Sequence, residues 1–154
     1  MKNLRTNLQF FLSLSLLFAF LSDGYPQERN PFHLKLTTDL QEYLAVVRAN
    51  PEMEMVDLEK AVKGIRSDIR YATPDNFTGA VIYTEPRAFV RLPVARALQK
   101  VQDSLKSHQL SLKVFDAYRP YAATLKFYEV YPDTNFVANP RYGSRHNRGC
   151  AVDV

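Results

Sequence analysis

The chain has 154 residues, of which 46% are hydrophobic and 12% aromatic, which is enough for one core of ordinary size and excludes the disordered and fibrous classes. The formal net charge is +4, and the basic residues are scattered among the acidic ones rather than gathered in a stripe. We therefore expect no nucleic-acid partner.

The first 24 residues have the pattern of a secretory signal peptide. Lys2 and Arg5 precede an apolar run at 8–21, and small residues follow it. The run is shorter than the roughly 20 residues that cross a bilayer as a helix. No cysteine follows it to carry a lipid anchor, since the only cysteine is Cys150. We expect residues 1–24 to be cleaved, and the product to be exported to the periplasm or secreted, with no stable membrane span.

Residues 25–35 are mostly polar and contain two prolines, so we expect a linker or arm there and a single domain at 36–154. The next segment, TTDLQEYLAVVRANP, has apolar residues at intervals of four and three behind a cap at Thr38 or Asp39. It predicts a short amphipathic helix that ends at Asn50 and Pro51.

Residues 55–83 favour strands. MVDLEKAVKGIRSDIRYAT carries β-branched and aromatic residues with partial alternation, and TPDNFTGAVIY supplies turn residues before another apolar run. We predict strand, loop, strand. In RLPVARALQKVQDSLKSHQL, Pro93 stands near a first helical position and four apolar residues share one face, which predicts a helix: Val94, Leu98, Val101 and Leu105.

The last third of the chain mixes both patterns. LSLKVFDAY alternates and predicts a strand that ends before Arg119 and Pro120, and PYAATLKFYEVY predicts a second helix with Ala123, Phe127 and Val130 on one side. A polar connection at 132–149 leads to GCAVDV, the start of a strand. Helices and strands without a regular βαβ repeat indicate an α+β fold, with a small mixed or antiparallel sheet packed against helices.

His146 and Asp153 are candidate metal ligands. The histidine lies in a glycine-flanked loop and the aspartate seven residues later in a predicted strand. Zinc accepts a histidine nitrogen and a carboxylate oxygen, and catalytic zinc takes three protein ligands and a water. The spacing alone fixes no distance, so a surface histidine and a hydrogen-bonded strand aspartate are the alternative.

Asp116 and Arg119 form a second constellation. The carboxylate can pair with the guanidinium and orient its remaining donors toward negative charge that develops on an attacked carbonyl. A structural ion pair that braces the turn before Pro120 is the alternative. In SDIRYATPDNFTG, Tyr71 and Asn76 could contact a polar substrate, or serve only as strand and turn residues.

Three segments, DIRYATPDNFTG, LKVFDAYRP and SRHNRGCAVDV, together resemble the D-alanyl-D-alanine dipeptidases of the VanX type over roughly residues 55–154. These are zinc enzymes that hydrolyse the dipeptide used to build peptidoglycan. The resemblance implies one zinc ion per chain in the full-length family member, and D-Ala-D-Ala or a related small cell-wall peptide as substrate. It also implies roles for six residues: His146 and Asp153 bind zinc, Arg119 stabilises the transition state, Asp116 orients Arg119, and Tyr71 and Ser144 lie near the amino end of the substrate.

That family takes its catalytic glutamate and a third zinc ligand, a histidine, from a later Glu-x-x-His segment, and this sequence contains no such pattern. We therefore expect a C-terminally truncated copy with an incomplete fold, weakened zinc binding and lost hydrolysis. The alternative is a non-catalytic module that binds peptidoglycan peptides. A replacement ligand from His33 or His108, or a site completed across a dimer, is a third possibility.

Overall fold

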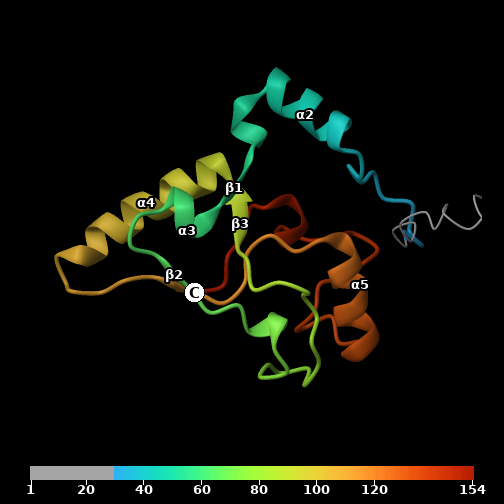
Figure 1. Ribbon diagram of the computed structural model, residues 1–154. Helices are drawn as coiled ribbons and strands as arrows, with labels where there is room; N and C mark the ends of the chain where they lie inside the picture. Colours follow the sequence, from blue (N-terminus) through green and yellow to red (C-terminus); the bar gives the residue numbers. More distant parts are fainter. Residues whose placement is uncertain (1–29) are drawn as a thin grey trace, which may run out of the picture.

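The computed structural model describes residues 30–154 (Figure 1). The predicted signal peptide (1–24) and residues 25–29 of the predicted arm lie outside the described residues. Within residues 30–154, no helix combines the length and the apolar character that a membrane span requires.

The first helix within the described residues, α2 (Leu40–Ala49), confirms the prediction from its sequence period. Asp39 is the N-cap, and its side chain accepts a hydrogen bond of 2.9 Å from the backbone N–H of Glu42. Asn50 ends the helix and caps a short 3-10 turn, η2 (Pro51–Met53). No residue of α2 is buried, and the helix lies at the edge of the molecule (Figure 1).

Two small two-stranded sheets form the centre of the fold. Strand β1 (Met55–Asp57) pairs antiparallel with β3 (Phe89–Arg91), and β2 (Arg66–Ser67) pairs parallel with β4 (Lys113–Val114). The fold is therefore α+β with mixed pairing, as the sequence predicts.

The two other helices that the sequence predicts are also confirmed. Helix α4 (Leu92–Lys106) has its proline in the first turn, and α5 (Tyr121–Val130) begins after Pro120. Figure 1 shows the two helices on opposite sides of the central strands, with the short helix α3 (Leu58–Ala61) beside α4.

The prediction of strand, loop, strand for residues 55–83 is wrong in its details. The helix α3 and a 3-10 turn, η3 (Arg70–Ala72), interrupt the first segment. The run AVIY forms no strand, because the backbone N–H groups of Ile82 and Tyr83 both donate to the carbonyl of Tyr71, at 2.8 and 2.9 Å. Tertiary hydrogen bonds thus override the local strand preference.

Two smaller expectations also differ from the structure. Val130 is 41% exposed, because α5 packs through residues of its first seven positions instead. The C-terminal GCAVDV segment forms a single antiparallel bridge, between Asp153 and Asp116, rather than a longer strand.

The buried apolar side chains form two clusters. The main core joins α3, β3, α4 and β4 and consists of Leu58, Val62, Ile65, Ile69, Ala88, Val90, Ala95, Val114 and Ala117. The second core lies around α5 and consists of Ile82, Ala123, Phe127 and Val137. Tyr83 packs against both clusters. Its side chain therefore lies at the junction of the two cores.

Gly149 connects the sheet to the loop that carries His146. It ends the 3-10 turn η4 (His146–Arg148) with φ of 68°, and its carbonyl accepts a hydrogen bond of 2.9 Å from the backbone N–H of Arg91 in β3. A Cβ atom here would lie 2.7 Å from the sulfur of Met55 and 3.3 Å from the nitrogen of Arg91. Glycine is required both for the left-handed backbone and for this close approach.

Gly149→Ala should destabilise the protein more than Gly79→Ala. Both glycines have a φ near 67°, but nothing lies within 4 Å of a Cβ at Gly79. The left-handed backbone alone should cost about 1 kcal/mol in Gly79→Ala. Overpacking against β1 and β3 should add about 1–3 kcal/mol in Gly149→Ala. Urea unfolding of the two variants measures the difference, and equal losses would contradict the packing role.

Candidate functional site

A buried ion pair between Asp116 and Arg119 lies at the centre of the site. Asp116 directly follows the β4 region and is fully buried, and Arg119 is 7% exposed. The Nε and Nη2 groups of Arg119 donate to Oδ2 of Asp116, at 3.2 and 2.5 Å. Oδ1 accepts from the Tyr83 hydroxyl at 2.6 Å and from the backbone N–H of Ala117 at 2.8 Å. Both carboxylate oxygens are therefore hydrogen-bonded, as a buried charge requires.

The surroundings of this pair keep Arg119 charged and Tyr83 neutral. Burial acts to lower the pKa of Arg119, but the Asp116 carboxylate and the Tyr83 oxygen outweigh it, so the pKa is raised. Burial, and after it the negative charge of Asp116, raises the pKa of Tyr83 far above its ordinary value. At neutral pH the tyrosine is thus a hydrogen-bond donor to the carboxylate.

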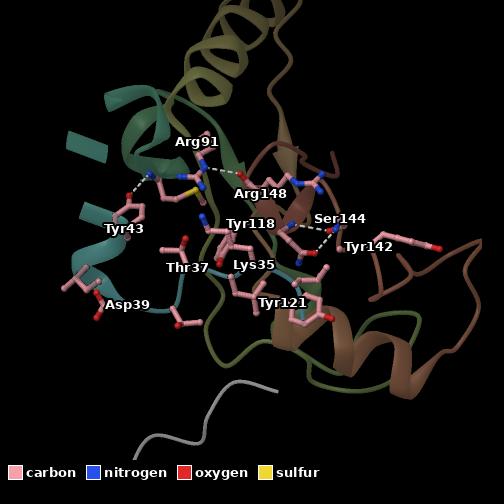
Figure 2. Close-up of a pocket in the computed structure, with 17 residues that line it drawn as sticks. Lys35, Thr37, Asp39, Tyr43, Arg91, Tyr118, Tyr121, Tyr142, Ser144 and Arg148 are labelled. Atoms are coloured by element: carbon pink, nitrogen blue, oxygen red, sulfur yellow. Dashed lines mark hydrogen bonds between the residues drawn. The ribbon is translucent and has the colours of Figure 1, made fainter. Parts of the chain in front are cut away.

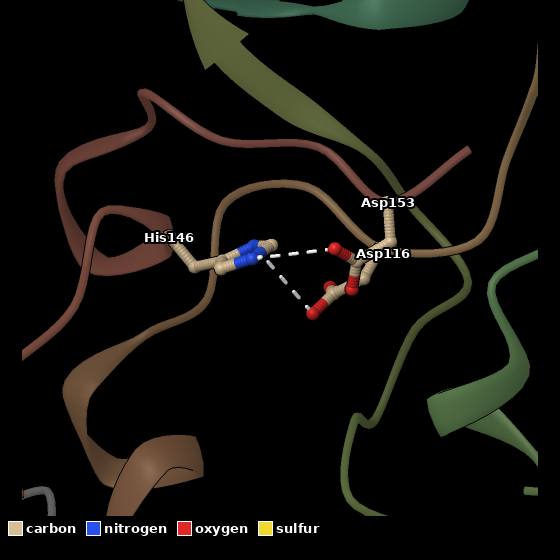
Figure 3. A group of neighbouring side chains, drawn as sticks. All are labelled: Asp116, His146 and Asp153. Carbon is tan, nitrogen blue, oxygen red and sulfur yellow. Dashed lines mark ion pairs between the residues drawn. The ribbon is translucent and has the colours of Figure 1, made fainter. Parts of the chain in front are cut away.

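The side chain of His146 has a fixed orientation. Its Nδ1 lies 2.8 Å from the carbonyl oxygen of Ala117. Because a carbonyl only accepts, Nδ1 carries a proton, and Nε2 is the ring nitrogen that is left to bind a metal. Nε2 lies 3.6 Å from Oδ1 of Asp153, as Figure 3 shows. The two residues that the sequence predicts as ligands therefore face each other.

The spacing of these two atoms fits zinc. Ligand atoms at about 2.0–2.2 Å from a tetrahedral zinc ion lie about 3.3–3.6 Å apart. The backbone carbonyl behind His146 is also the usual partner of the second ring nitrogen in metal-bound histidines. A ligand atom of Asp116 lies within 4.8 Å of the other two, but its carboxylate already binds Arg119 and Tyr83. Asp116 is therefore engaged by the arginine and the tyrosine, and His146 and Asp153 are the two residues whose ligand atoms have no such partner between them and a metal.

Backbone pairing places Asp153 beside Asp116. The N–H of Phe115 donates to the carbonyl of Asp153 at 2.8 Å, and the N–H of Asp153 donates to the carbonyl of Asp116 at 2.9 Å. The side chain of Asp153 is half exposed, whereas that of Asp116 is buried. Of the two residues paired in this bridge, Asp116 therefore has its carboxylate in the interior and Asp153 has its carboxylate at the surface.

Asn147 fastens the loop that carries His146, and the sequence analysis missed it. Its Nδ2 donates to the carbonyl of Arg119 and to the hydroxyl of Thr124, both at 2.8 Å. The backbone N–H of Arg119 in turn donates to the carbonyl of His146 at 3.1 Å. The only sign of this role in the sequence was that Asn147 directly follows His146. Tyr83 was also missed, because it lies 33 residues from its partner Asp116.

A cavity of about 230 Å³ opens between the arginine and the two candidate ligands. Its walls also include aromatic and small apolar residues: Tyr71, Phe77, Phe127, Phe136, Val137 and Ala138. The Cζ atom of Arg119 lies 4.4 Å from the ring centroid of Phe127, within cation–π range. Burial raises the pKa of Tyr71, so its hydroxyl stays neutral. Tyr71 thus lines the same cavity as Arg119 and the two candidate ligands, and its contact with substrate stays a prediction.

Ser144 lies elsewhere. It lines a larger cavity, of about 660 Å³, between the 34–40 segment and the loop that carries His146 (Figure 2). Its hydroxyl accepts a hydrogen bond of 3.1 Å from the backbone N–H of Asn147. The structure therefore brings Tyr71, Arg119 and the two candidate ligands to one cavity and does not bring Ser144 there. Substrate contact by Ser144 stays a prediction.

Comparison with known proteins identifies the family of the chain. Residues 51–154 match the family described as D-ala-D-ala dipeptidase (Peptidase_M15). The chain belongs to the D-Ala-D-Ala dipeptidase family. The resemblance stated from the three sequence segments is therefore confirmed.

Three curated relatives carry the name D-alanyl-D-alanine dipeptidase. The chain is 34% identical to that of Escherichia coli (strain K12) over 101 residues, which are 66% of this chain and 52% of the relative. It is 28% identical to that of Enterococcus faecium over 67% of this chain and 61% of the relative. It is 29% identical to that of Enterococcus faecalis (strain ATCC 700802 / V583) over 63% of this chain and 58% of the relative. The match thus spans between about half and three fifths of the length of these dipeptidases.

Asp116→Ala should strongly destabilise the protein. The substitution leaves the buried Arg119 charge without its partner, which typically costs about 3–5 kcal/mol. Asp103→Ala is the matched control, because Asp103 pairs with Lys106 at the exposed surface and its loss should be far smaller. Urea unfolding followed by circular dichroism measures both. Similar losses in the two variants would show that the buried pair contributes no more than a surface pair.

Proposed function

We propose that this chain carries the zinc and arginine part of a D-alanyl-D-alanine dipeptidase, a metallopeptidase site that cleaves a small dipeptide of cell-wall metabolism. The family is zinc-dependent. The observation that carries the proposal is the 3.6 Å separation between Nε2 of His146 and Oδ1 of Asp153, with the other ring nitrogen bound to a backbone carbonyl. In this proposal His146 and Asp153 are two of the zinc ligands.

Bound zinc supplies Lewis-acid polarisation of the peptide carbonyl and an activated water. The role of Arg119 follows from its own contacts. Nε and Nη2 hold Asp116, which leaves Nη1 as a donor for the oxygen on which negative charge develops. Asp116 and the ring of Phe127 hold the guanidinium in place before substrate arrives, so no reorganisation is needed during the reaction.

The cavity walls favour a small substrate. A volume of about 230 Å³ with a partly aromatic lining suits a dipeptide with methyl side chains better than a longer peptide. Tyr71 contributes both a ring face and a neutral hydroxyl to this wall. Export directed by residues 1–24 belongs to the same proposal. This sequence has no Glu-x-x-His pattern and the relatives are longer than the matched segment, so the proposal for this chain is limited to the metal and arginine part of the site, and hydrolysis is left to the wild-type assay below.

His146→Ala should remove zinc from the protein. The wild-type chain should bind zinc, and the variant should bind it at least about tenfold more weakly because it loses a nitrogen ligand. Mass spectrometry of metal content, after dialysis against limiting zinc, measures both. His108→Ala is the control, since His108 is exposed and lies outside the cavity. Zinc retained in His146→Ala, or absent from the wild type, would refute the metal assignment.

Arg119→Lys should separate metal binding from catalysis. Lysine keeps the positive charge beside Asp116 but lacks the planar fork that reaches the carboxylate and a second acceptor together. Zinc content should therefore stay at the wild-type value. If the wild-type chain hydrolyses D-Ala-D-Ala, the release of D-alanine should fall by a factor of about 100 or more in the variant. An unchanged rate would exclude the arginine from the reaction. A wild-type chain that binds the dipeptide without cleaving it would favour the binding-module alternative.

A further inference from the structure

We propose that Tyr83 is a positioning residue, whose hydroxyl fixes the direction of the Arg119 guanidinium by bridging it to Asp116. This inference rests on the proposed function. It extends the proposed function by one residue. Tyr83 contacts Asp116 and Nε of Arg119, and it acts on the reaction only through this ion pair.

The hydroxyl of Tyr83 makes two bonds of opposite sense. It donates to Oδ1 of Asp116 at 2.6 Å and accepts from Nε of Arg119 at 3.3 Å. A carboxylate only accepts and a guanidinium only donates, so neither bond can be reversed. The orientation of the phenol is therefore determined by both partners, and the three groups form a closed hydrogen-bonded ring.

The ion pair needs this third member because Arg119 contacts a single carboxylate oxygen. Nε and Nη2 both donate to Oδ2, whereas the stronger bidentate arrangement uses both oxygens. Oδ1 is held instead by Tyr83 and by the backbone N–H of Ala117. Without the hydroxyl, the carboxylate can rotate and carry the guanidinium with it.

The hydroxyl stands on a rigid ring. The aromatic ring of Tyr83 packs edge-to-face with Tyr71 at 5.9 Å and with Phe127 at 6.4 Å between ring centroids. Its backbone N–H donates to the carbonyl of Tyr71 at 2.9 Å. Because these contacts belong to the ring and the backbone, Tyr83→Phe should keep the packing and remove only the bridge.

The first test follows Arg119 directly and needs no activity. In the full chain, nitrogen-15 NMR observes the Nε–H signal of Arg119, assigned by its loss in Arg119→Lys. Tyr83→Phe should speed the exchange of this proton with water by about tenfold or more, since one hydrogen bond to a charged group is lost. Tyr128→Phe is the matched control, because Tyr128 also packs on the second core and its hydroxyl makes no hydrogen bond within residues 30–154. An unchanged Arg119 signal in Tyr83→Phe would overturn the inference.

The second test separates positioning from general damage. Calorimetry compares D-Ala-D-Ala with its phosphinate analogue, whose tetrahedral group resembles the transition state. Tyr83→Phe should weaken phosphinate binding by about tenfold and dipeptide binding by less than about threefold. Equal weakening of both ligands, or none, would overturn the proposed role. If the wild-type chain holds no zinc and binds neither ligand, the proposed function fails, and the NMR comparison alone then decides the role of Tyr83.

Discussion

The rest of the site depends on one buried ion pair. A charge pair removed from water is tolerated only when every oxygen and nitrogen facing the interior finds a partner. Asp116 meets this condition through Arg119, Tyr83 and the backbone of Ala117. Arg119 and Ala117 lie in the segment that follows β4, and Tyr83 lies in the segment that precedes β3. The convergence of these segments, and the packing of Phe127 of α5 on the guanidinium, are thus consequences of placing a charge in the core.

The candidate metal ligands are held differently from the arginine. The side chains of His146 and Asp153 are 17% and 50% exposed, whereas that of Arg119 is 9% exposed. The fold fixes the arginine by burial, and hydrogen bonds then fasten the loop of His146 to the arginine's own backbone. Asn147 supplies one of these links and the carbonyl of His146 another. Site residues on loops are commonly placed by a rigid scaffold, and here the ion pair is part of that scaffold.

The sequence predicted the parts of this structure that local patterns encode. Helix α2 follows from its apolar period and its cap, and helices α4 and α5 follow from their apolar periods and the prolines at their starts. The pair Asp116 and Arg119 follows from a strand that ends in a turn. The strand β3 and the helix α3 could not be read from local preference, because hydrogen bonds to distant residues decide both. The same reason hid Tyr83, whose partner is 33 residues away, and it hid the separation of Ser144 from the cavity that His146 lines.

Ala117 shows how core packing and site geometry are coupled. Its methyl group belongs to the main core and is 2% exposed. Its N–H holds Oδ1 of Asp116, and its carbonyl holds Nδ1 of His146, each at 2.8 Å. One residue of the backbone therefore sets both the carboxylate that orients the arginine and the ring nitrogen that leaves Nε2 free for a metal. A core substitution that shifts Ala117 would move both groups together, so the geometry of the site and the packing of the core are coupled.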